Sequence, residues 1–571
     1  MKHFLNNIPI NPRNVLEIGL STNNTGNPEL LSIDTDTIIL PREANQIILS
    51  HLATQGVFEG IPYSIELETG LKLEYYVDLT QSAIYRDFET EVKIIKRNGL
   101  DNFMENAQGL SFELLNSKGV NFNLIDVPYL IIPENQGELG ISLSIATFVI
   151  TKESIQATKD LVTATRDLIE ATSPNVGIPP VPPIGEIISL SLALAAQIVY
   201  TAAVYLALVK LARQMFELAF PKVRYYKGST IKDLIEKGCT YLGYTLNSNL
   251  LNNFSQLTLM PVPLSKKKKG IFDYIQNDLN FSFTKGYPTA QDSVSTLGEL
   301  ISAVELWFNA RTRVNNGIVE IERRDYWQNI TTNTTLPALN IQDDRQNEYR
   351  LNTEEAWKRS YIHYRVDFSD THTLDFFDPT DAEYSTEPVN VINKDLVSIK
   401  GFNDISIPFA LGVRKDKLNW LENLAKDFFQ LIDQITGVFG AGTSLASQIG
   451  NRVGVTQISQ QFYSVTKVLY AINGKQPANY INTLKASEIY NNFHKINEIT
   501  LNSYKVYSDV PLRMKSTEFV SLINNNFAYI NGVLCEILTI RFTDEQSNAI
   551  ISYKEPFNYA LGKVSILTIN D

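Results

Sequence analysis

The clearest alternation of hydrophobic and polar residues lies between residues 61 and 79. Apolar side chains fall on odd positions there, and the even positions are mainly charged or polar. A period of two places one face of a strand in a core and the other in water, as is typical of antiparallel sheets. Because Glu68-Thr69-Gly70 supplies a turn, the segment predicts a β-hairpin. Its apolar positions are Ile61, Tyr63, Ile65, Leu67, Leu71, Leu73, Tyr75, Val77 and Leu79.

Shorter patterns predict further elements along the chain. Helical spacing of apolar residues predicts helices at residues 296–310 and 417–435. A Gly- and Ser-rich segment at residues 439–454 predicts a long loop. Strands are expected at residues 91–95, 110–115, 141–150, 318–324, 533–543 and 549–553.

The pattern changes at residue 151. Residues 151–172 have apolar side chains at roughly helical spacing. Residues 173–185 contain five prolines, which cannot continue a helix and favour an extended linker. Residues 187–209 contain no charged side chain.

The uncharged segment 187–209 predicts a hydrophobic helix. Such a helix measures about 35 Å, against about 30 Å for the hydrocarbon core of a bilayer. Its Ala, Ser and Gln content makes permanent insertion into lipid marginal. We therefore expect a helix that is buried in an assembly and faces a membrane or a lumen on release. The residues expected to form its apolar surface are Ile187, Leu190, Leu194, Ile198, Val204 and Leu208.

These elements predict an α+β multidomain protein. Its sheets are expected to be mainly antiparallel, with an inserted hydrophobic helical hairpin. The expected divisions are a β domain at 1–150, a helical insertion with a proline hinge at 151–221, a mixed domain at 222–400, a helical and loop segment at 401–498 and a β segment at 499–571.

Composition narrows the range of functions. The net charge of -12 argues against general nucleic-acid binding, which needs a basic face. Cys239 and Cys535 are far apart in the sequence and predict two buried free thiols rather than a disulfide framework. The N-terminus lacks the apolar core of a signal peptide, so we expect synthesis in a host cytoplasm.

Motifs that carry chemistry are missing from the sequence. It contains no HExxH, no phosphate-binding Gly-rich loop ending in Gly-Lys-Ser/Thr and no Gly-x-Ser-x-Gly. The acidic run at 375–383 lacks the spacing of a Ca²⁺ loop, so we expect a solvated turn, with Ca²⁺ binding left open. Four lysines at 266–269 are expected in a solvated loop. The sequence thus predicts no catalytic, cofactor or metal site and a protein that is not an enzyme.

Four passages in the second half resemble tail proteins of phages that infect Bacteroidota hosts, in the baseplate-hub or tail-tip group. They are RVNNGIVEIERRDYW at 313–327, NIQDDR at 340–345, AEYSTEPVN at 382–390 and IGNRVG at 449–454. The likeness covers residues 297–553, and the N-terminal hairpin resembles the β domain that opens such proteins.

The resemblance implies a structural virion protein of the tail. Such a protein would form a trimeric hub of tube-like β domains that closes the end of the tail tube. Its implied partners are the distal tail protein, the tape-measure protein and a tail spike or fibre, with the host membrane as a further partner during genome delivery. No functional residue carries over, because the group has none that maps onto this chain position by position.

Two other functions stay open at this point. A membrane-inserting or pore-forming protein anchored by residues 187–209 would explain the uncharged segment. A tail enzyme that cleaves host cell wall would need paired carboxylates at a defined separation, which a sequence alone cannot supply.

Overall fold

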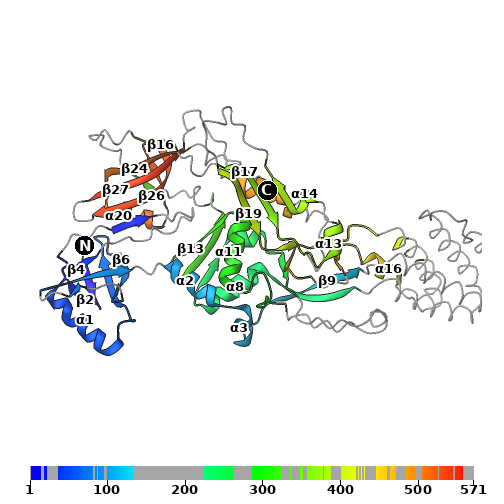
Figure 1. Ribbon diagram of the computed structural model, residues 1–571, viewed down its shortest axis with the longest axis horizontal. Helices are drawn as coiled ribbons and strands as arrows, with labels where there is room; N and C mark the ends of the chain where they lie inside the picture. Colours follow the sequence, from blue (N-terminus) through cyan, green and yellow to red (C-terminus); the bar gives the residue numbers. More distant parts are fainter. Residues whose placement is uncertain are drawn as a thin grey trace, which may run out of the picture.

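The computed structural model describes the chain in ranges separated by gaps. The described residues are 2–13, 18–21, 37–80, 84–85, 88–95, 99–132, 223–262, 286–315, 317–323, 326, 334–336, 348–351, 357–376, 379–386, 400–418, 422–423, 426, 430, 445–459, 463–470, 483–495, 504–524, 526–543 and 547–556. Across these ranges the fold consists mostly of antiparallel-rich β-sheets, two of them nearly closed, together with helices (Figure 1).

The N-terminal sheet is nearly closed. Its main strand order is β2-β1-β5-β6-β8-β4, and β7 also pairs with β8. After β2 the Arg13 amide donates a hydrogen bond to the Ile39 carbonyl of β4, 2.9 Å away, which brings the two ends of the sheet together. The strands are β1 (Lys2–Leu5), β2 (Ile8–Ile10), β4 (Ile38–Pro41), β5 (Ile61–Glu66), β6 (Lys72–Asp78), β7 (Ile84–Tyr85) and β8 (Glu89–Ile95).

The predicted hairpin at residues 61–79 is confirmed. Strands β5 and β6 pair antiparallel, from Ile61 opposite Val77 to Glu66 opposite Lys72. Buried and more exposed positions alternate along both strands, as the period of two requires. Gly70 has a φ of 80°, a conformation that favours glycine, within the turn.

A second sheet returns on itself. Its order is β20-β23-β12-β10-β9-β22-β21, and the strands at its two ends are separated in sequence by Gly412 alone. One short segment therefore pairs with β23 through its first half and with β22 through its second half. The strands are β9 (Leu124–Ile132), β10 (Arg224–Thr230), β12 (Leu257–Met260), β20 (Ala410–Leu411), β21 (Val413–Arg414), β22 (Thr456–Ser459) and β23 (Lys467–Tyr470).

Helices and two small sheets form a central core beside this second sheet (Figure 1). The predicted helix at 296–310 is confirmed as α11 (Leu297–Phe308), which Thr296 and Glu299 cap reciprocally. The predicted strand at 318–324 is β14 (Ile318–Arg323). The other elements are α2 (Gly99–Gly109), α3 (Phe112–Ser117), α8 (Ile231–Tyr241), β11 (Thr245–Asn247), α9 (Asn249–Asn253), β13 (Ala310–Asn315), β17 (Trp357–Tyr364), α13 (Thr371–Phe376), α14 (Pro379–Ala382), β18 (Glu383–Ser385), β19 (Lys400–Ile407), α16 (Leu445–Gly450), α18 (Ala486–Ile489) and the π-helix η2 (Tyr490–His494).

The C-terminal sheet shares one hydrophobic core with the N-terminal sheet. Strand β3 (Ile18–Ser21) pairs antiparallel with β26 (Val533–Thr543), so the two ends of the described chain are joined. The strands predicted at 533–543 and 549–553 are confirmed as β26 and β27 (Asn548–Pro556). The remaining elements are β15 (Thr334–Thr335), β16 (Arg350–Leu351), β24 (Tyr504–Arg513), α20 (Ser516–Asn524) and β25 (Phe527–Ile530).

Two local predictions are wrong. Residues 110–115 were expected to be a strand, but they enter helix α3, whose N-cap Ser111 accepts a hydrogen bond from the Leu114 amide. Phe112 and Leu115 lie three positions apart and are both buried, a helical rather than an alternating pattern. The loop predicted at 439–454 contains helix α16.

Several predicted segments lie outside the described residues. These are 141–150, all of 151–221, the lysines at 266–269 and most of 417–435. The ends of the longest gap are placed, however, because β9 and β10 are neighbouring antiparallel strands in which Tyr129 lies opposite Arg224. Residues 133–222 therefore leave and rejoin the second sheet at the same end. Among the helices of the described ranges, none is long and apolar enough to cross a bilayer.

The predicted division into five ranges stays a prediction. The sheets combine strands across those boundaries: β3 pairs with β26, and β9 pairs with β22.

Candidate functional site

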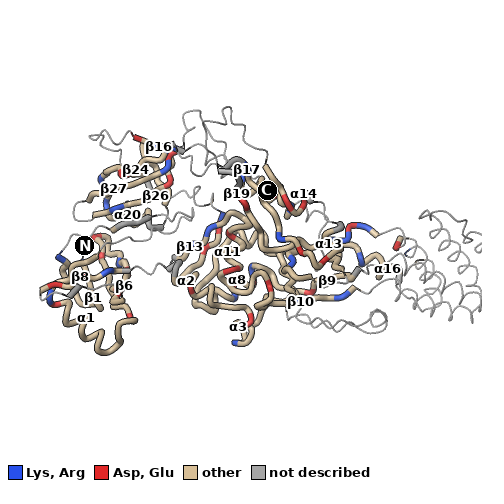
Figure 2. The backbone as a smooth tube through the Cα atoms, in the orientation of Figure 1, with Lys and Arg blue, Asp and Glu red and all other residues tan. Residues whose placement is uncertain are grey.

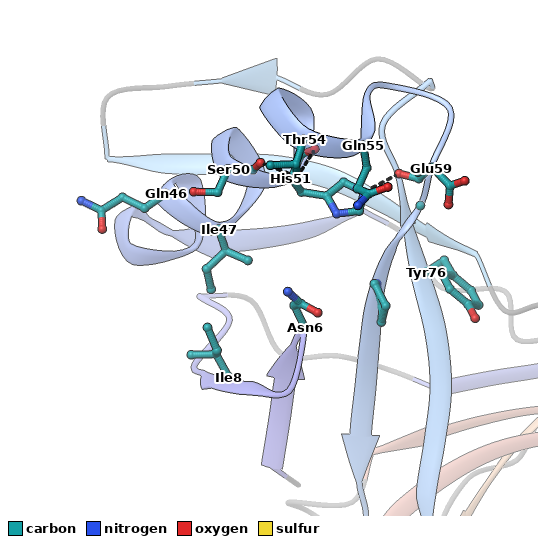
Figure 3. A pocket seen from close by; sticks show the side chains of 12 residues that line it. Asn6, Ile8, Gln46, Ile47, Ser50, His51, Thr54, Gln55, Glu59 and Tyr76 are labelled. Atoms are coloured by element: carbon teal, nitrogen blue, oxygen red, sulfur yellow. Dashed lines mark hydrogen bonds between the residues drawn. The ribbon is translucent and has the colours of Figure 1, made fainter.

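An open hollow lies on the N-terminal sheet domain, between helix α1 (Arg42–Gln55), the turn from β1 to β2 and the strands β5 and β6. Its volume is about 620 Å³. Figure 3 shows Asn6 and Ile8 of the turn facing Ile47 of the helix across it. The lining residues are Asn6, Ile8, Gln46, Ile47, Ser50, His51, Thr54, Gln55, Glu59, Gly60, Pro62 and Tyr76.

Local sequence fixes the walls of the hollow. Asn6 and Asn7 adopt positive φ values of 49° and 64°, as a tight turn between two antiparallel strands requires, and this places Ile8 beside the helix. Helix α1 buries Ala44 and Ile48 in the core. Its opposite face therefore points toward solvent.

Beyond its first turn, where Arg42 and Glu43 are exposed, helix α1 carries no Asp, Glu, Lys or Arg. Residues 44–58 contain no Asp, Glu, Lys or Arg, and Figure 2 shows α1 almost entirely in tan. Large apolar side chains are exposed here, with Leu49 60% exposed and Phe58 94% exposed. Val57 and Tyr76 are exposed beside them. Depletion of charge together with exposed aromatic and aliphatic groups is typical of the core of a protein–protein interface.

The loop that carries Phe58 is held at both ends. Gly56 ends α1 with a φ of 83°, and its amide donates to the Leu52 carbonyl at 3.2 Å. At Gly60 the backbone passes so close to β6 that a Cβ would lie 3.1 Å from the Cβ of Tyr76. The His51 Nε2 donates to the Glu59 carbonyl at 2.8 Å and secures the loop from the side (Figure 3). Phe58 thus projects from an anchored loop.

The ionisable side chains lining the hollow are His51, Glu59 and Tyr76. The His51 ring is committed to a backbone carbonyl rather than to a carboxylate. The arrangement therefore suits the binding of an uncharged protein surface better than proton transfer, which needs a paired acid and base.

A second cluster of polar groups lies buried at the second sheet. Lys467 Nζ is 3.2 Å from Asp367 Oδ2 and 2.9 Å from Asp370 Oδ2, and all three side chains are 0% exposed. Two influences on the pKa of Asp367 oppose each other: burial raises it, whereas Lys467 and the hydrogen bonds from Ser369 and Ser464 lower it. The lowering influences are together the stronger, so the pKa of Asp367 lies below its ordinary value. The Asp370 carboxylate also accepts from the amide and hydroxyl of Thr373.

This buried cluster ties distant parts of the chain together. Asp367 and Asp370 flank the turn before α13, and Lys467 begins β23. Their oxygen and nitrogen atoms are enclosed and mutually bonded, so the cluster offers no access to a substrate, and loss of one partner would leave an uncompensated buried charge.

A third group of polar side chains lies on the three-stranded sheet β18-β17-β19. His363 Nε2 is 3.1 Å from Asp404 Oδ1, and the Tyr361 hydroxyl donates to Glu383 at 2.6 Å. That hydrogen bond, with burial and the nearby carboxylates, raises the pKa of Tyr361 to about 12. The pairs lie on the sheet surface, and no group of His, Cys, Asp and Glu in the described residues has the arrangement of a metal site.

The sequence-predicted positions fall in different places. Ile187, Leu190, Leu194, Ile198, Val204 and Leu208 lie outside the described residues. In the acidic run, Asp381 pairs with Lys485 at 3.0 Å and Glu383 accepts from Tyr361, so these two carboxylates have separate partners. Cys239 and Cys535 are free and buried, as expected, in two different cores.

The hollow beside α1 was missed in the sequence. The available signal was the stretch at 44–58, which has no charged residue and ends in an aromatic. Searches for catalytic motifs do not detect such a surface, because it is defined by missing charge and not by a motif.

Comparison with protein-family models, with curated proteins and with solved structures finds no match at a significant level.

Proposed function

We propose that this chain is a structural protein of a phage tail, a tail-tip or baseplate hub that closes the tail tube. In the proposed assembly three copies associate, contact the distal tail protein and the tape-measure protein, and seat a spike or fibre. The protein is made in the host cytoplasm, is carried in the virion and performs no catalysis. The sequence passages that resemble tail-tip proteins are one support for this proposal.

The structural observation that carries the proposal is the pair of nearly closed sheets. The second sheet returns on itself through residues 410–414, and Arg13 joins the two ends of the first. Closed sheets have few free edges, which limits open-ended strand addition. Their outer faces are then the surfaces on which a symmetric assembly is built.

The position of the longest gap supports a role for the uncharged segment. The strands β9 and β10 that flank residues 133–222 are antiparallel neighbours, so the described strand order of the second sheet does not include the segment between them. In the proposal, residues 187–209 stay covered in the assembly and turn toward the host membrane during genome delivery.

The test is to measure the mass of the purified full chain by light scattering, to view it by negative-stain electron microscopy, and to locate it in virions with antibody-bound gold. The proposal expects a mass of three chains, ring-shaped particles and gold at the tail tip. A stable single chain that forms no ring and is not found in virions would contradict it.

The uncharged segment also supports a second candidate, a membrane-inserting protein anchored by residues 187–209. Flotation with liposomes separates the two functions. The hub is expected to stay in the dense fraction as a full chain, whereas a membrane-anchored protein floats without any trigger.

A further inference from the structure

We propose that Lys467 and Asp370 condense after folding into an amide bond between their side chains, with Asp367 as the proton acceptor. The ion-paired cluster described above is then the state that precedes the bond. The inference does not depend on the tail function. It rests on the contacts of three buried side chains and on the hydrogen-bond donors around them.

The amine and the carboxyl group lie in contact in a site that is closed to water. Lys467 Nζ is 2.9 Å from Asp370 Oδ2, the oxygen bonded to the carbon that the amine would attack, and both side chains are 0% exposed. The buried ring of Tyr463 covers the amine, with its centroid 5.1 Å from Nζ. Two reacting groups held together in this way react as if at a concentration of about 10⁵–10⁸ M.

The two oxygens of Asp370 have different surroundings. Oδ1 accepts hydrogen bonds from two backbone amides, that of Ser459 at 3.0 Å and that of Thr373 at 3.3 Å. Backbone donors at such a position stabilise the negative charge that a carbonyl oxygen acquires when a nucleophile attacks. Oδ2 faces the amine and accepts from the Thr373 hydroxyl at 2.6 Å. The donors therefore mark Oδ1 as the oxygen that stays and Oδ2 as the oxygen that leaves.

Asp367 is placed to take a proton from the amine, because its Oδ2 lies 3.2 Å from Lys467 Nζ. Its Oδ1 accepts from the backbone amides and the hydroxyls of Ser369 and Ser464. These donors and Lys467 keep the pKa of Asp367 below its ordinary value. Asp367 therefore carries the negative charge of the cluster while Asp370 is protonated.

The condensation needs no other reagent. One proton passes from the Lys467 ammonium group to Asp370 Oδ2, which leaves a neutral amine and a neutral carboxyl group. The Nζ lone pair forms a bond to Cγ, and the electron pair of the C=O bond moves to Oδ1. Asp367 takes a second proton from Nζ and delivers it to Oδ2. The C–Oδ2 bond then breaks and the carbonyl group forms again, so the products are an amide, one water molecule and unchanged Asp367.

Burial favours the amide over the ion pair. The cluster holds one positive and two negative charges on side chains that are 0% exposed, and enclosing charges is costly. Condensation removes one charge of each sign from this interior, and the exclusion of water hinders hydrolysis of the product. The charge that remains lies on Asp367, which keeps its hydrogen bonds from Ser369 and Ser464.

Folding has to bring the reacting groups together. Asp367 and Asp370 flank the turn before α13, whereas Lys467 begins β23 of the second sheet. The bond would join positions that are 467 minus 370, or 97, residues apart. It would therefore fix α13 to the second sheet covalently.

Mass spectrometry of the full chain under denaturing conditions tests the inference. Wild type that has been incubated in the folded state should be lighter than its sequence by the mass of one water molecule. A chain held unfolded in urea should keep its full mass. A tryptic digest of the folded protein should contain a branched peptide that joins the residues around Asp370 to those around Lys467, with the chain uncut at Lys467.

Variants separate the roles of the three side chains. Lys467→Arg keeps a positive charge, but a guanidinium group stays protonated and cannot attack, so this variant should keep its full mass. Asp367→Asn has no proton-accepting carboxylate and should form the bond about 10²–10⁴-fold more slowly. The matched control is Lys415→Met, which breaks another buried ion pair, 2.8 Å from Glu422, and should form the branched peptide as fast as wild type. Circular dichroism confirms that each variant is folded.

Folded wild type that keeps its full mass would overturn the inference. A lighter chain without the branched peptide would also overturn it, because an aspartate that cyclises onto its own backbone loses one water molecule as well. Fragment ions that place the branch at Asp367, or an unchanged rate in Asp367→Asn, would overturn the roles assigned to the two carboxyl groups. These measurements do not depend on the number of chains in the particle, so the proposed hub stands or falls separately.

Discussion

Replacing Lys467 with methionine removes the ammonium group that lies between Asp367 and Asp370. The side chain keeps most of its length, so the change leaves little empty space but removes the positive charge. Lys467 and its two partners are 0% exposed, and water cannot take the place of the ammonium group without local unfolding. Two carboxylates then face each other in the interior without their cation.

The expected loss of stability follows from the geometry. A pair of opposite charges 4 Å apart interacts by about 4 kcal/mol at an effective dielectric constant of 20, and Lys467 makes two contacts closer than that. Much of this attraction only offsets the cost of burying the charges. Removing one partner of a buried ion pair typically costs about 3–5 kcal/mol, and we expect a loss in this range for Lys467→Met.

The change also reverses the dependence of stability on pH. In the native chain the pKa of Asp367 lies below its ordinary value of 3.8, so its stabilising contribution is present above that value and is lost as pH falls below it. Without Lys467 the main influence that lowers the pKa of Asp367 is gone, and burial raises the pKa of that carboxyl. The variant should therefore recover part of its lost stability as the pH is lowered from 7 toward 5, because protonation removes the repulsion.

Amide hydrogen exchange read by mass spectrometry measures the effect locally, in peptides that cover β17, α13 and β23. The control is Lys505→Met, which breaks the partly exposed pair with Glu555 and should cost less than about 1 kcal/mol. If Lys467→Met loses no more than this control, or becomes still less stable on acidification, the electrostatic account of the cluster is refuted.

Three further predictions concern the core and the insertion. Burial lowers the pKa of His494 from 6.5 to about 4, with Arg311 adding to the effect against the hydrogen bond to Trp307. His494 is neutral in the fold above pH 6.5, and the free energy of unfolding should fall by up to about 3 kcal/mol as the pH is lowered from 6.5 to 4. In His494→Gln the free energy of unfolding, measured with urea, should depend less on pH across that range. Gly238→Ala would place a Cβ 2.7 Å from a methyl carbon of Leu297 and should lower the free energy of unfolding by about 1–3 kcal/mol in the same assay. An unchanged free energy of unfolding would mean that α8 and α11 readily move apart. Replacing residues 133–222 with a short Gly-Ser turn should leave amide protection in β9 and β10 unchanged, and its loss would show that the segment is part of the sheet's core.

Elements encoded by local patterns were predictable. The alternation at 61–79 predicted the β5–β6 hairpin, and the helical spacing of apolar residues at 296–310 predicted α11. The residues at 110–115 were misread because a short apolar run fits either a strand or a helix. The deciding feature was the Ser111 cap, a single side-chain contact.

Features that depend on distant residues were not predictable. Lys467 lies 100 positions from Asp367, and no local pattern links them. The second sheet closes because residues 410–414 pair with β23 on one side and with β22 on the other. The register of these pairings involves residues that are distant in the sequence, so no local pattern predicts it. Helix α1 was not predicted because its apolar residues do not keep to one face: Ile48 is buried, but the neighbouring Leu49 is 60% exposed.

The pairing of β3 with β26 has a consequence for the order in which the protein forms during synthesis. Leu20 lies opposite Ile540, so the two strands are separated by 540 minus 20, or 520, positions. At about 5–20 residues per second, the ribosome needs roughly 26–104 s to make the second strand after the first. During that time the early strand has no partner in β26, and the core that β3 and β26 share is completed only after β26 has been made. A chain released early would keep its N-terminal hairpin but leave apolar surface uncovered, which makes truncated products easy for cellular quality control to recognise.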